Sequence, residues 1–309
     1  MNIIRDIGGL KTAGRKVCVA IGFFDGVHIG HQQIIRQTVT NAHQHETIAL
    51  VVTFDRHPNT AVAPKRVPLL IYSLPQKLRA IESLGADSLL LLHFDQLFSE
   101  QPASVFIRKL AHGLGQIQSL CVGANFLFGH KRAGDVELLR QLGDELRFTV
   151  SALPAVALDG KAVSSTRIRE AIQTGKLESA SQMLGRAYSV SGTIVRGDAL
   201  GQQLGFPTAN LDATGLALPP TGVYAAHATI PGQTYRAVVN IGYRPTLQHP
   251  SPPPLRVEAH LLDFKGDLLG SELEVTFVEK LREEKQFASL AKLREQISQD
   301  ILEAQKRFQ

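Results

Sequence analysis

The sequence predicts an α/β domain built on an open parallel sheet, followed by an all-β domain that forms a small antiparallel barrel with a terminal helix. Two observations support this fold class. Short apolar runs alternate with helical patterns in the first half, whereas from Tyr188 onward short strand-like runs are separated by clusters of Pro and Gly. The 309 residues suffice for two domains. We place the boundary near Gly185 and expect domains at 1–185 and 186–309.

Apolar runs in the first half are typical of buried parallel strands because they are short, nearly continuous and partly β-branched. They are Val17–Gly22, Ile48–Phe54, Ser88–Phe94, Leu120–Gly123 and Phe148–Leu153. Helical patterns lie between them, at 30–43, 75–84, 103–111 and 136–142. This alternation predicts right-handed crossovers, and ligands of such sheets bind at the carboxyl ends of the strands.

Two short helices, at 165–173 and 178–184, are expected before the barrel, with Gly175 and Gly185 as their stops. The barrel strands are predicted at 188–195, 223–230, 236–241, 256–264 and 272–278. A helix at 287–308 closes the chain because its apolar residues recur at near-helical spacing. The Pro-rich segment Gln248–Pro254 is expected to be a stiff, exposed loop.

The composition is that of an ordinary globular protein, with 44% hydrophobic and 20% charged residues. The chain has neither an apolar run of about 18 residues nor the pattern of a secretory signal, so we expect no membrane span and no signal peptide. Cys18 and Cys121 both lie in apolar runs. They indicate free core thiols in a reducing compartment, the cytoplasm.

The net charge of +5 suits either nucleic acid or small anionic substrates. The chain has no Trp and no block of Lys and Arg, and its Phe residues are not interleaved with basic residues as in a nucleic-acid stacking platform. We therefore expect phosphate-bearing small molecules as partners, and no nucleic acid. The sequence leaves the oligomeric state open, with a homo-oligomer as one alternative.

The first motif is Gly22-Phe23-Phe24-Asp25-Gly26-Val27-His28-Ile29-Gly30-His31, which follows the first strand and opens the next helix. His28 and His31 share one helix face, where free N–H groups already favour an anion. Two imidazoles can add hydrogen-bond donors that stabilise the charge developing at a reacting phosphorus. We assign the surrounding positions to ATP binding, namely Gly22, Phe24, Asp25 and Gly30. The alternative, a strand–turn–helix junction with incidental histidines, is disfavoured by the paired histidines.

Two further segments support a phosphate site in the first domain. In Ser164-Ser165-Thr166-Arg167-Ile168-Arg169, a hydroxyl cap opens a helix whose first turn carries arginines, where the helix dipole disfavours cations unless a polyphosphate binds. Asn125 ends a strand and is placed to contact a ligand. Phe126 and Phe128 either line the pocket of an aromatic ligand or pack into the core, and the sequence leaves both open.

The second motif is a loop with the glycines Gly197, Gly201 and Gly205, followed by Phe206-Pro207-Thr208-Ala209-Asn210. The glycines permit a flap of N–H groups around phosphates, although no Gly-Lys-[Ser/Thr] of a Walker loop is present. Thr208 and Asn210 lie two apart in an extended segment and offer oxygen ligands for Mg²⁺.

Strand alternation places Glu258 and His260 on one face, with Val257 and Ala259 on the other. A carboxylate near the metal can take the proton of an attacking hydroxyl. On spacing alone, a solvent-facing barrel residue is the better interpretation of Glu258.

These residues resemble the nucleotidyltransferase superfamily of His-x-Gly-His adenylyltransferases, and more closely the N-terminal module of bacterial bifunctional riboflavin kinase/FAD synthetases. The resemblance implies a Rossmann-like module that transfers AMP from ATP to FMN, giving FAD and pyrophosphate. It implies that His28 and His31 stabilise the reacting phosphates. It further implies that Ser165, Thr166 and Arg169 bind the triphosphate and that Asn125 helps place the nucleotide or metal.

The second half resembles the riboflavin kinase module of the same family. The matching segments, in order, are Gly205–Asn210, Gly222-Val223-Tyr224, Asn240–Thr246, Val257–His260 and Leu281–Phe287. The resemblance implies that Glu258 is the general base for the ribityl 5′-hydroxyl and that Thr208 and Asn210 hold Mg²⁺ with ATP. It places Arg282 near the flavin or the phosphate.

The chain departs from the family pattern at several positions. Arg56 replaces a frequent Pro, Asn125-Phe126-Leu127 replaces Asp-Phe-Arg, and Leu269 replaces a usual Tyr. The expected protein is a cytoplasmic bifunctional enzyme that uses riboflavin, FMN, ATP and Mg²⁺. The alternatives are a member with one silent site and a flavin-binding regulator that binds RNA through its basic surface.

Overall fold

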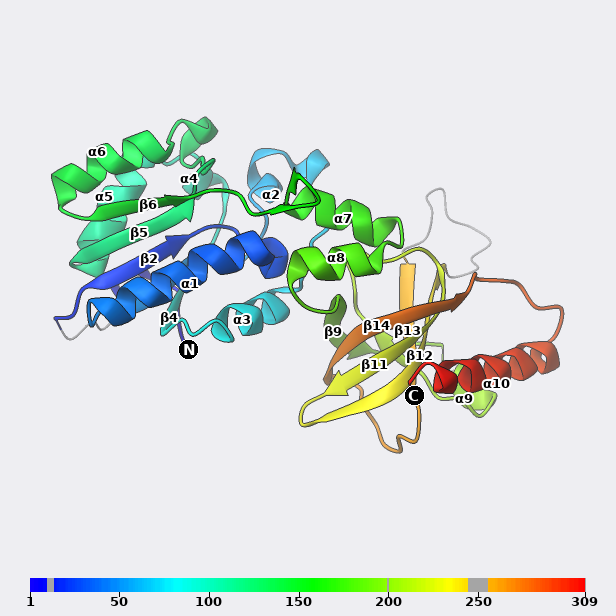
Figure 1. The fold of residues 1–309 in the computed structure, drawn as a ribbon. Coiled ribbons are helices and arrows are strands. Elements are labelled where there is room, and N and C mark those ends of the chain that lie inside the picture. Colours follow the sequence, from blue (N-terminus) through cyan, green and yellow to red (C-terminus); the bar gives the residue numbers. More distant parts are fainter. Residues whose placement is uncertain (10–13, 199, 244–254, 309) are drawn as a thin grey trace. The chain divides into compact units, whose positions relative to one another are not determined.

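The computed structural model describes residues 1–9, 14–198, 200–243 and 255–308. The chain divides into two compact units (Figure 1). The first contains Met1–Leu70 and Leu74–Ser165, and the second contains Ile71–Ser73 and Thr166–Gln309. The division falls inside the helix α7 (Ser165–Gln173), after Ser165. The expected Pro-rich loop at 248–254 lies outside the described residues.

The first unit is an open six-stranded sheet with the order β1-β4-β3-β2-β5-β6, and all neighbours are parallel. The strands are β1 (Asn2–Ile4), β2 (Val17–Ile21), β3 (Ile48–Phe54), β4 (Ser88–Leu92), β5 (Ile117–Gly123) and β6 (Thr149–Leu153). The predicted parallel sheet is confirmed. The edge strand β1 was not predicted because three residues are too few to show a hydrophobic period.

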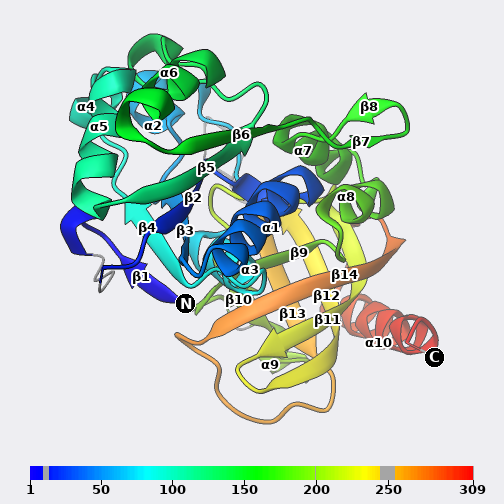
Figure 2. The ribbon, with the colours of Figure 1, turned by 60° about the vertical axis from the view of Figure 1, so that its left-hand side comes forward.

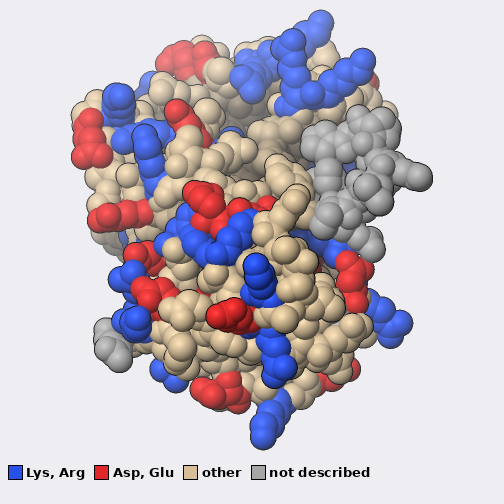
Figure 3. Space-filling view, turned by 90° about the vertical axis from the view of Figure 1, so that its right-hand side faces the viewer, with Lys and Arg blue, Asp and Glu red and all other residues tan. Residues whose placement is uncertain are grey.

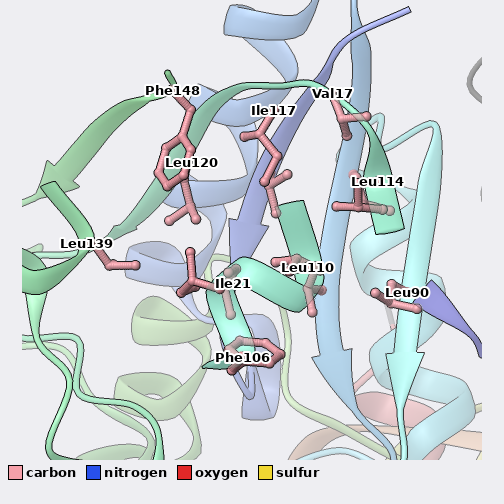
Figure 4. Close-up of a cluster of buried hydrophobic side chains, with 14 of the residues drawn as sticks. Val17, Ile21, Leu90, Phe106, Leu110, Leu114, Ile117, Leu120, Leu139 and Phe148 are labelled. Atoms are coloured by element: carbon pink, nitrogen blue, oxygen red, sulfur yellow. The ribbon is translucent and has the colours of Figure 1, made fainter. Parts of the chain in front are cut away.

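Helices cover both faces of this sheet (Figure 2). They are α1 (Ile29–Gln44), α2 (Asn59–Val62), α3 (Leu74–Glu82), α4 (Gln96–Ser99), α5 (Ala103–Leu114) and α6 (Val136–Leu146). Side chains alternate along β2, so Val19 and Ile21 pack with α5 and α6, whereas Ala20 packs with α1 and α3. Figure 4 shows the first of these cores, where Phe106 and Leu110 of α5 contact the sheet.

The second unit begins with two helices, α7 (Ser165–Gln173) and α8 (Leu177–Leu184), and continues as a closed antiparallel barrel. Its strands are β9 (Ser189–Val195), β10 (Ala209–Leu211), β11 (Gly222–Ile230), β12 (Gln233–Tyr243), β13 (Leu255–Leu261) and β14 (Glu272–Arg282). They close in the order β10-β13-β12-β11-β14-β9. The predicted barrel is confirmed, with the three-residue β10 as the strand that the pattern did not reveal.

The remaining elements complete this picture. The hairpin β7 (Ala157–Leu158) and β8 (Lys161–Ala162) precedes α7, and the single turn α9 (Leu200–Gln203) precedes β10. The predicted terminal helix is α10 (Leu290–Lys306), which covers the barrel because Ala304 packs against Val223, Ala225 and Val238. None of the helices in the described ranges combines the length and apolarity that crossing a bilayer requires. Cys18 and Cys121 are buried free thiols, as predicted.

Candidate functional site

The turn after β2 is strained and tightly packed. Phe24 and Val27 adopt positive φ angles of 54° and 41°, a region that side chains rarely occupy. Both are buried, as is Asp25 between them. A Cβ at Gly22 would lie 2.7 Å from Cε1 of the Phe24 ring, so the turn requires glycine there. Burial of Phe24 and Val27 holds a backbone conformation that would otherwise be costly.

His28 and His31 lie together at the start of α1. His28 is the N-cap, and its Nδ1 accepts a hydrogen bond from the His31 backbone N–H at 3.3 Å. In the neutral imidazole, this bond places the His28 proton on Nε2. The two rings stack with centroids 3.5 Å apart, and the His31 ring also contacts the edge of Phe24. The structure thus brings the two predicted histidines into one rigid pair.

The His31 side chain is held neutral near pH 7. Burial lowers the pKa of His31 well below its usual value, and the electrostatic influence of His28 and Lys77 adds to this effect. The buried Nδ1 of His31 has no hydrogen-bond partner among the described residues. A neutral imidazole with a free ring nitrogen is suited to a hydrogen bond with a ligand oxygen.

Two adjoining cavities open at this end of the sheet. A cavity of about 440 Å³ is lined by the predicted residues Gly22, Phe24, His28, Gly30, His31, Asn125 and Ser165. A second cavity of about 790 Å³ shares Ile21, Gly22, Phe23, Asn125 and Phe126 with it. Ser165 also donates a hydrogen bond to the Asp25 carbonyl at 3.1 Å. Thr166 and Arg169, by contrast, belong to the second unit and line neither cavity.

The larger cavity is aromatic and suits a flat ring system. Phe126 and Phe128 stack with centroids 5.3 Å apart and an interplanar angle of 12°, and both line it. Phe128 is also buried in the core and Phe126 packs against it, so core packing is confirmed, whereas contact with an aromatic ligand stays a prediction. The departure Leu127 is exposed and belongs to the same lining. The structure therefore joins a smaller cavity beside the histidines, the histidine cavity, to a larger aromatic one.

Lys77 on α3 is a buried residue of this site that the sequence analysis missed. Its ammonium donates hydrogen bonds to the carbonyls of Phe54 at 2.7 Å and Phe23 at 3.3 Å. Burial lowers the pKa of Lys77 to about 8. A signal was available, because Lys77 stands four residues before the core residue Ile81 and so occupies the apolar stripe of its helix.

In the second unit, Thr208 and Asn210 line one cavity of about 710 Å³ together with Gly197. A Cβ at Gly197 would overlap the Asn210 side-chain amide, which explains glycine at this position. Gly201 lies in α9 and Gly205 follows it with φ +89°, and neither lines the cavity. The predicted flap is therefore partly helical. The Thr208 hydroxyl and the Asn210 amide oxygen fit a hard cation that also binds phosphate oxygens and water.

Glu258 is brought beside Asn210 by the register of the barrel. Asn210 of β10 and Asn240 of β12 are its direct cross-strand partners, and such partners lie side by side on one face. Val257 and Ala259 are buried on the other face, as predicted. Partial burial raises the pKa of Glu258; the negative charge of Asp198 adds to this effect and Arg256 opposes it. Glu258 does not line the 710 Å³ cavity itself.

Arg282, predicted near the flavin or phosphate, is engaged in a structural ion pair. Its guanidinium donates to both carboxylate oxygens of Asp300 at 2.8 and 2.7 Å, and Asp300 is 5% exposed. A third bond goes to the Glu283 carbonyl. Arg282 therefore fixes the end of β14 to α10, and its proposed ligand contact stays a prediction. Leu269, another departure from the family pattern, is half exposed and lines the 710 Å³ cavity.

The charged surface bears on the RNA-binding alternative. On the face shown in Figure 3, basic side chains gather along the upper edge but lie among acidic ones across the middle. Nucleic-acid binding relies on a continuous basic stripe or patch. The middle of this face does not present such a surface.

Comparison with known proteins extends these observations. The FAD synthetase family model matches residues 10–167, and the riboflavin kinase model matches residues 184–308. A bifunctional riboflavin kinase/FMN adenylyltransferase of Pseudomonas fluorescens is 38% identical, covering 98% of this chain and 97% of that protein. The proteins of the same description from Escherichia coli K12 and Bacillus subtilis 168 are 35% and 33% identical. These alignments cover 100% and 97% of this chain, and 98% and 95% of those proteins.

A solved structure shows the same fold. The crystal structure described as a macrolide-efflux protein from Streptococcus pneumoniae matches with a TM-score of 0.82 and 28% identity, over 98% of each chain. Both family models and the full-length relatives agree with a chain of two successive units. The chain therefore belongs to the family of bifunctional riboflavin kinase/FMN adenylyltransferases.

Proposed function

We propose that the protein phosphorylates riboflavin to FMN and then adenylylates FMN to FAD, using ATP in both reactions. The observation that carries this proposal is the match of two family models to successive halves of one chain, each containing its own cavity. We assign adenylyl transfer to residues 1–185 and riboflavin phosphorylation to residues 186–309. The buried free thiols of Cys18 and Cys121 support the cytoplasm as its compartment.

In the adenylyl transfer, a phosphate oxygen of FMN attacks the α-phosphorus of ATP. A new P–O bond forms, the bond to the β-phosphate breaks, and pyrophosphate leaves. The attacking oxygen is already anionic, so no base has to remove a proton. The His28 and His31 rings and the backbone N–H groups at the start of α1 would stabilise the growing negative charge. Catalysis in this unit then consists of positioning and charge stabilisation.

The aromatic cavity is the proposed flavin site, and the histidine cavity is the proposed nucleotide site. Asn125 lies in the wall that they share, where the phosphate of FMN would meet the α-phosphate of ATP. Phe126 and Phe128 offer ring faces to the isoalloxazine. Ser165, Thr166 and Arg169 remain the proposed ligands of the triphosphate.

In the phosphorylation, the ribityl 5′-hydroxyl of riboflavin attacks the γ-phosphorus of ATP and ADP leaves. Glu258 accepts the hydroxyl proton, and its raised pKa makes it a better base than an ordinary carboxylate. Thr208 and Asn210 would hold Mg²⁺, which when bound supplies positive charge to the phosphate oxygens. The glycines at 197, 201 and 205 would let the backbone approach those phosphates, and Arg282 is proposed to lie near the flavin or phosphate.

The test is chromatography of flavins after the purified protein is incubated with riboflavin, ATP and Mg²⁺. The expected result is FMN followed by FAD. His28→Ala should abolish FAD formation and spare FMN formation. Glu258→Gln should abolish FMN formation and spare FAD formation from supplied FMN. Loss of both activities in either variant, with both units still folded, would contradict the assignment of one reaction to each unit.

A further inference from the structure

Lys77 joins the carboxyl ends of two central strands next to the histidine pair. Its Nζ donates to the Phe54 carbonyl, at the end of β3, and to the Phe23 carbonyl, just beyond β2. Nζ also lies 3.5 Å from Oγ1 of Thr53, and that hydroxyl itself donates to the Phe23 carbonyl at 3.0 Å. The Phe23 carbonyl therefore accepts from two buried donors, which fixes the peptide that begins the strained turn.

The Phe23 side chain is fixed from both sides as well. Nζ of Lys77 lies 4.5 Å from the centroid of the Phe23 ring, and the His57 ring packs edge-on at 4.9 Å. Phe23 lines both the histidine cavity and the aromatic cavity. A change in its position would therefore disturb the nucleotide side and the flavin side at the same time.

Phe24 links the fixed Phe23 peptide to the histidines. Phe24 directly follows Phe23, adopts the left-handed conformation and contacts the His31 ring at 5.3 Å between centroids. Because a positive φ at Phe24 is unfavourable, the turn depends on its neighbours to keep this geometry. Lys77 supplies a charged anchor at the first peptide of the turn.

We propose that Lys77 is a positioning residue for adenylyl transfer: its ammonium fixes the peptide and ring of Phe23, and through Phe24 it holds the histidine pair against the wall shared by the two cavities. This inference rests on the proposed adenylyl transfer. Lys77 does not line either cavity, so it acts through the turn rather than on a substrate.

Three acceptors around Nζ match the three N–H donors of an ammonium group. An uncharged amine has only two donors and turns a lone pair toward an acceptor. The negative charges of Asp25 and Asp55 favour the protonated form, whereas burial opposes it. The nearby His31 is neutral near pH 7 because its own pKa is lowered. Burial dominates and lowers the pKa of Lys77 to about 8, so the anchor titrates within the range of an ordinary assay.

The experiment compares Lys77→Met and Lys77→Arg with the wild type, and uses Lys109→Met, an exposed lysine on α5, as the matched control. Adenylyl transfer is measured from supplied FMN and riboflavin phosphorylation from supplied riboflavin, between pH 7 and 9.5. A displacement of the histidines of about 1 Å costs on the order of 100-fold in rate. We expect Lys77→Met to lower kcat of adenylyl transfer by about 10–100-fold, with phosphorylation unchanged.

The pH profile separates positioning from mere stabilisation. The adenylyl transfer rate of the wild type should fall as pH rises through about 8. This limb should move to higher pH in Lys77→Arg, whose guanidinium stays charged, and be absent in Lys77→Met. Thermal unfolding and ATP binding by calorimetry show whether the first unit is folded in each variant. If Lys77→Met is unfolded, the positioning role is tested by the pH profiles of Lys77→Arg and the wild type alone.

Two results would overturn the inference. One is adenylyl transfer by Lys77→Met within twofold of the wild type, in both kcat and KM. The other is an alkaline limb that stays in place in Lys77→Arg. Failure of the wild type to form FAD at any pH would instead refute the proposed function of this unit.

Discussion

Substitution of Gly197 by Ala tests the proposed magnesium site of the barrel by steric displacement alone. The new Cβ would lie 2.5 Å from Cγ and 2.7 Å from Oδ1 of Asn210, whereas ordinary contacts begin at 3.4 Å. The Asn210 side chain must therefore move by about 1 Å, and displacement of a catalytic group by this distance costs on the order of 100-fold in rate. We expect riboflavin phosphorylation to fall by about 100-fold, with the dependence on Mg²⁺ shifted to higher concentration.

Gly232→Ala, in the turn between β11 and β12, is the matched control. Gly232 has φ +88°, but a Cβ added there would have no atom within 4 Å, so its substitution strains the backbone of the barrel without displacing Asn210. The assay is flavin chromatography over a series of Mg²⁺ concentrations, with FAD formation from supplied FMN as the internal reference. Phosphorylation by Gly197→Ala within twofold of the wild type at every Mg²⁺ concentration would refute the assignment of Asn210.

Three further predictions concern pH, an ion pair and the aromatic cavity. Because burial lowers the pKa of His31, the unfolded state binds more protons than the folded state below pH 6.5. The first unit should therefore lose thermal stability on acidification from that pH. The loss should be smaller in His31→Asn. Asp300→Ala leaves a largely buried Arg282 without its carboxylate and should destabilise the second unit by about 3 kcal/mol in urea unfolding; an unchanged free energy of unfolding would refute a stabilising role of this pair. Phe126→Ala should raise KM for FMN in adenylyl transfer with riboflavin phosphorylation unaffected; an unchanged KM would remove this ring from the flavin site.

Much of the fold could be predicted from the sequence because its long elements carry a clear hydrophobic period. The predicted runs at 48–54 and 148–153 are nearly continuous and partly β-branched, and they proved to be strands within a residue of their predicted limits. The three-residue strands β1 and β10 could not be found in this way, since they are shorter than one readable alternation. Their place is decided by pairing with β4 and β13, which is tertiary information.

The candidate site, like the fold, could be predicted only in part from the sequence. Residues grouped in one segment, such as His28 and His31, could be related by helix geometry alone. The neighbourhood of Glu258 and Asn210 depends on strand register between distant segments, so only the resemblance indicated it. Lys77 was overlooked because a lysine is ordinarily assigned to the surface. Here the buried ammonium donates hydrogen bonds to two carbonyls and lies over an aromatic ring.

The short strand β10 has a consequence for the dynamics of the barrel. It is joined to β13 through three residue pairs and to β9 through two, whereas β11 and β12 share nine. Local opening proceeds most easily where few hydrogen bonds hold an element, so amide hydrogen exchange should be fastest at this seam. Asn210 belongs to β10, and Thr208 immediately precedes it. A ligand held by these two residues would favour the closed form of β10, so nucleotide binding would slow amide exchange at this strand.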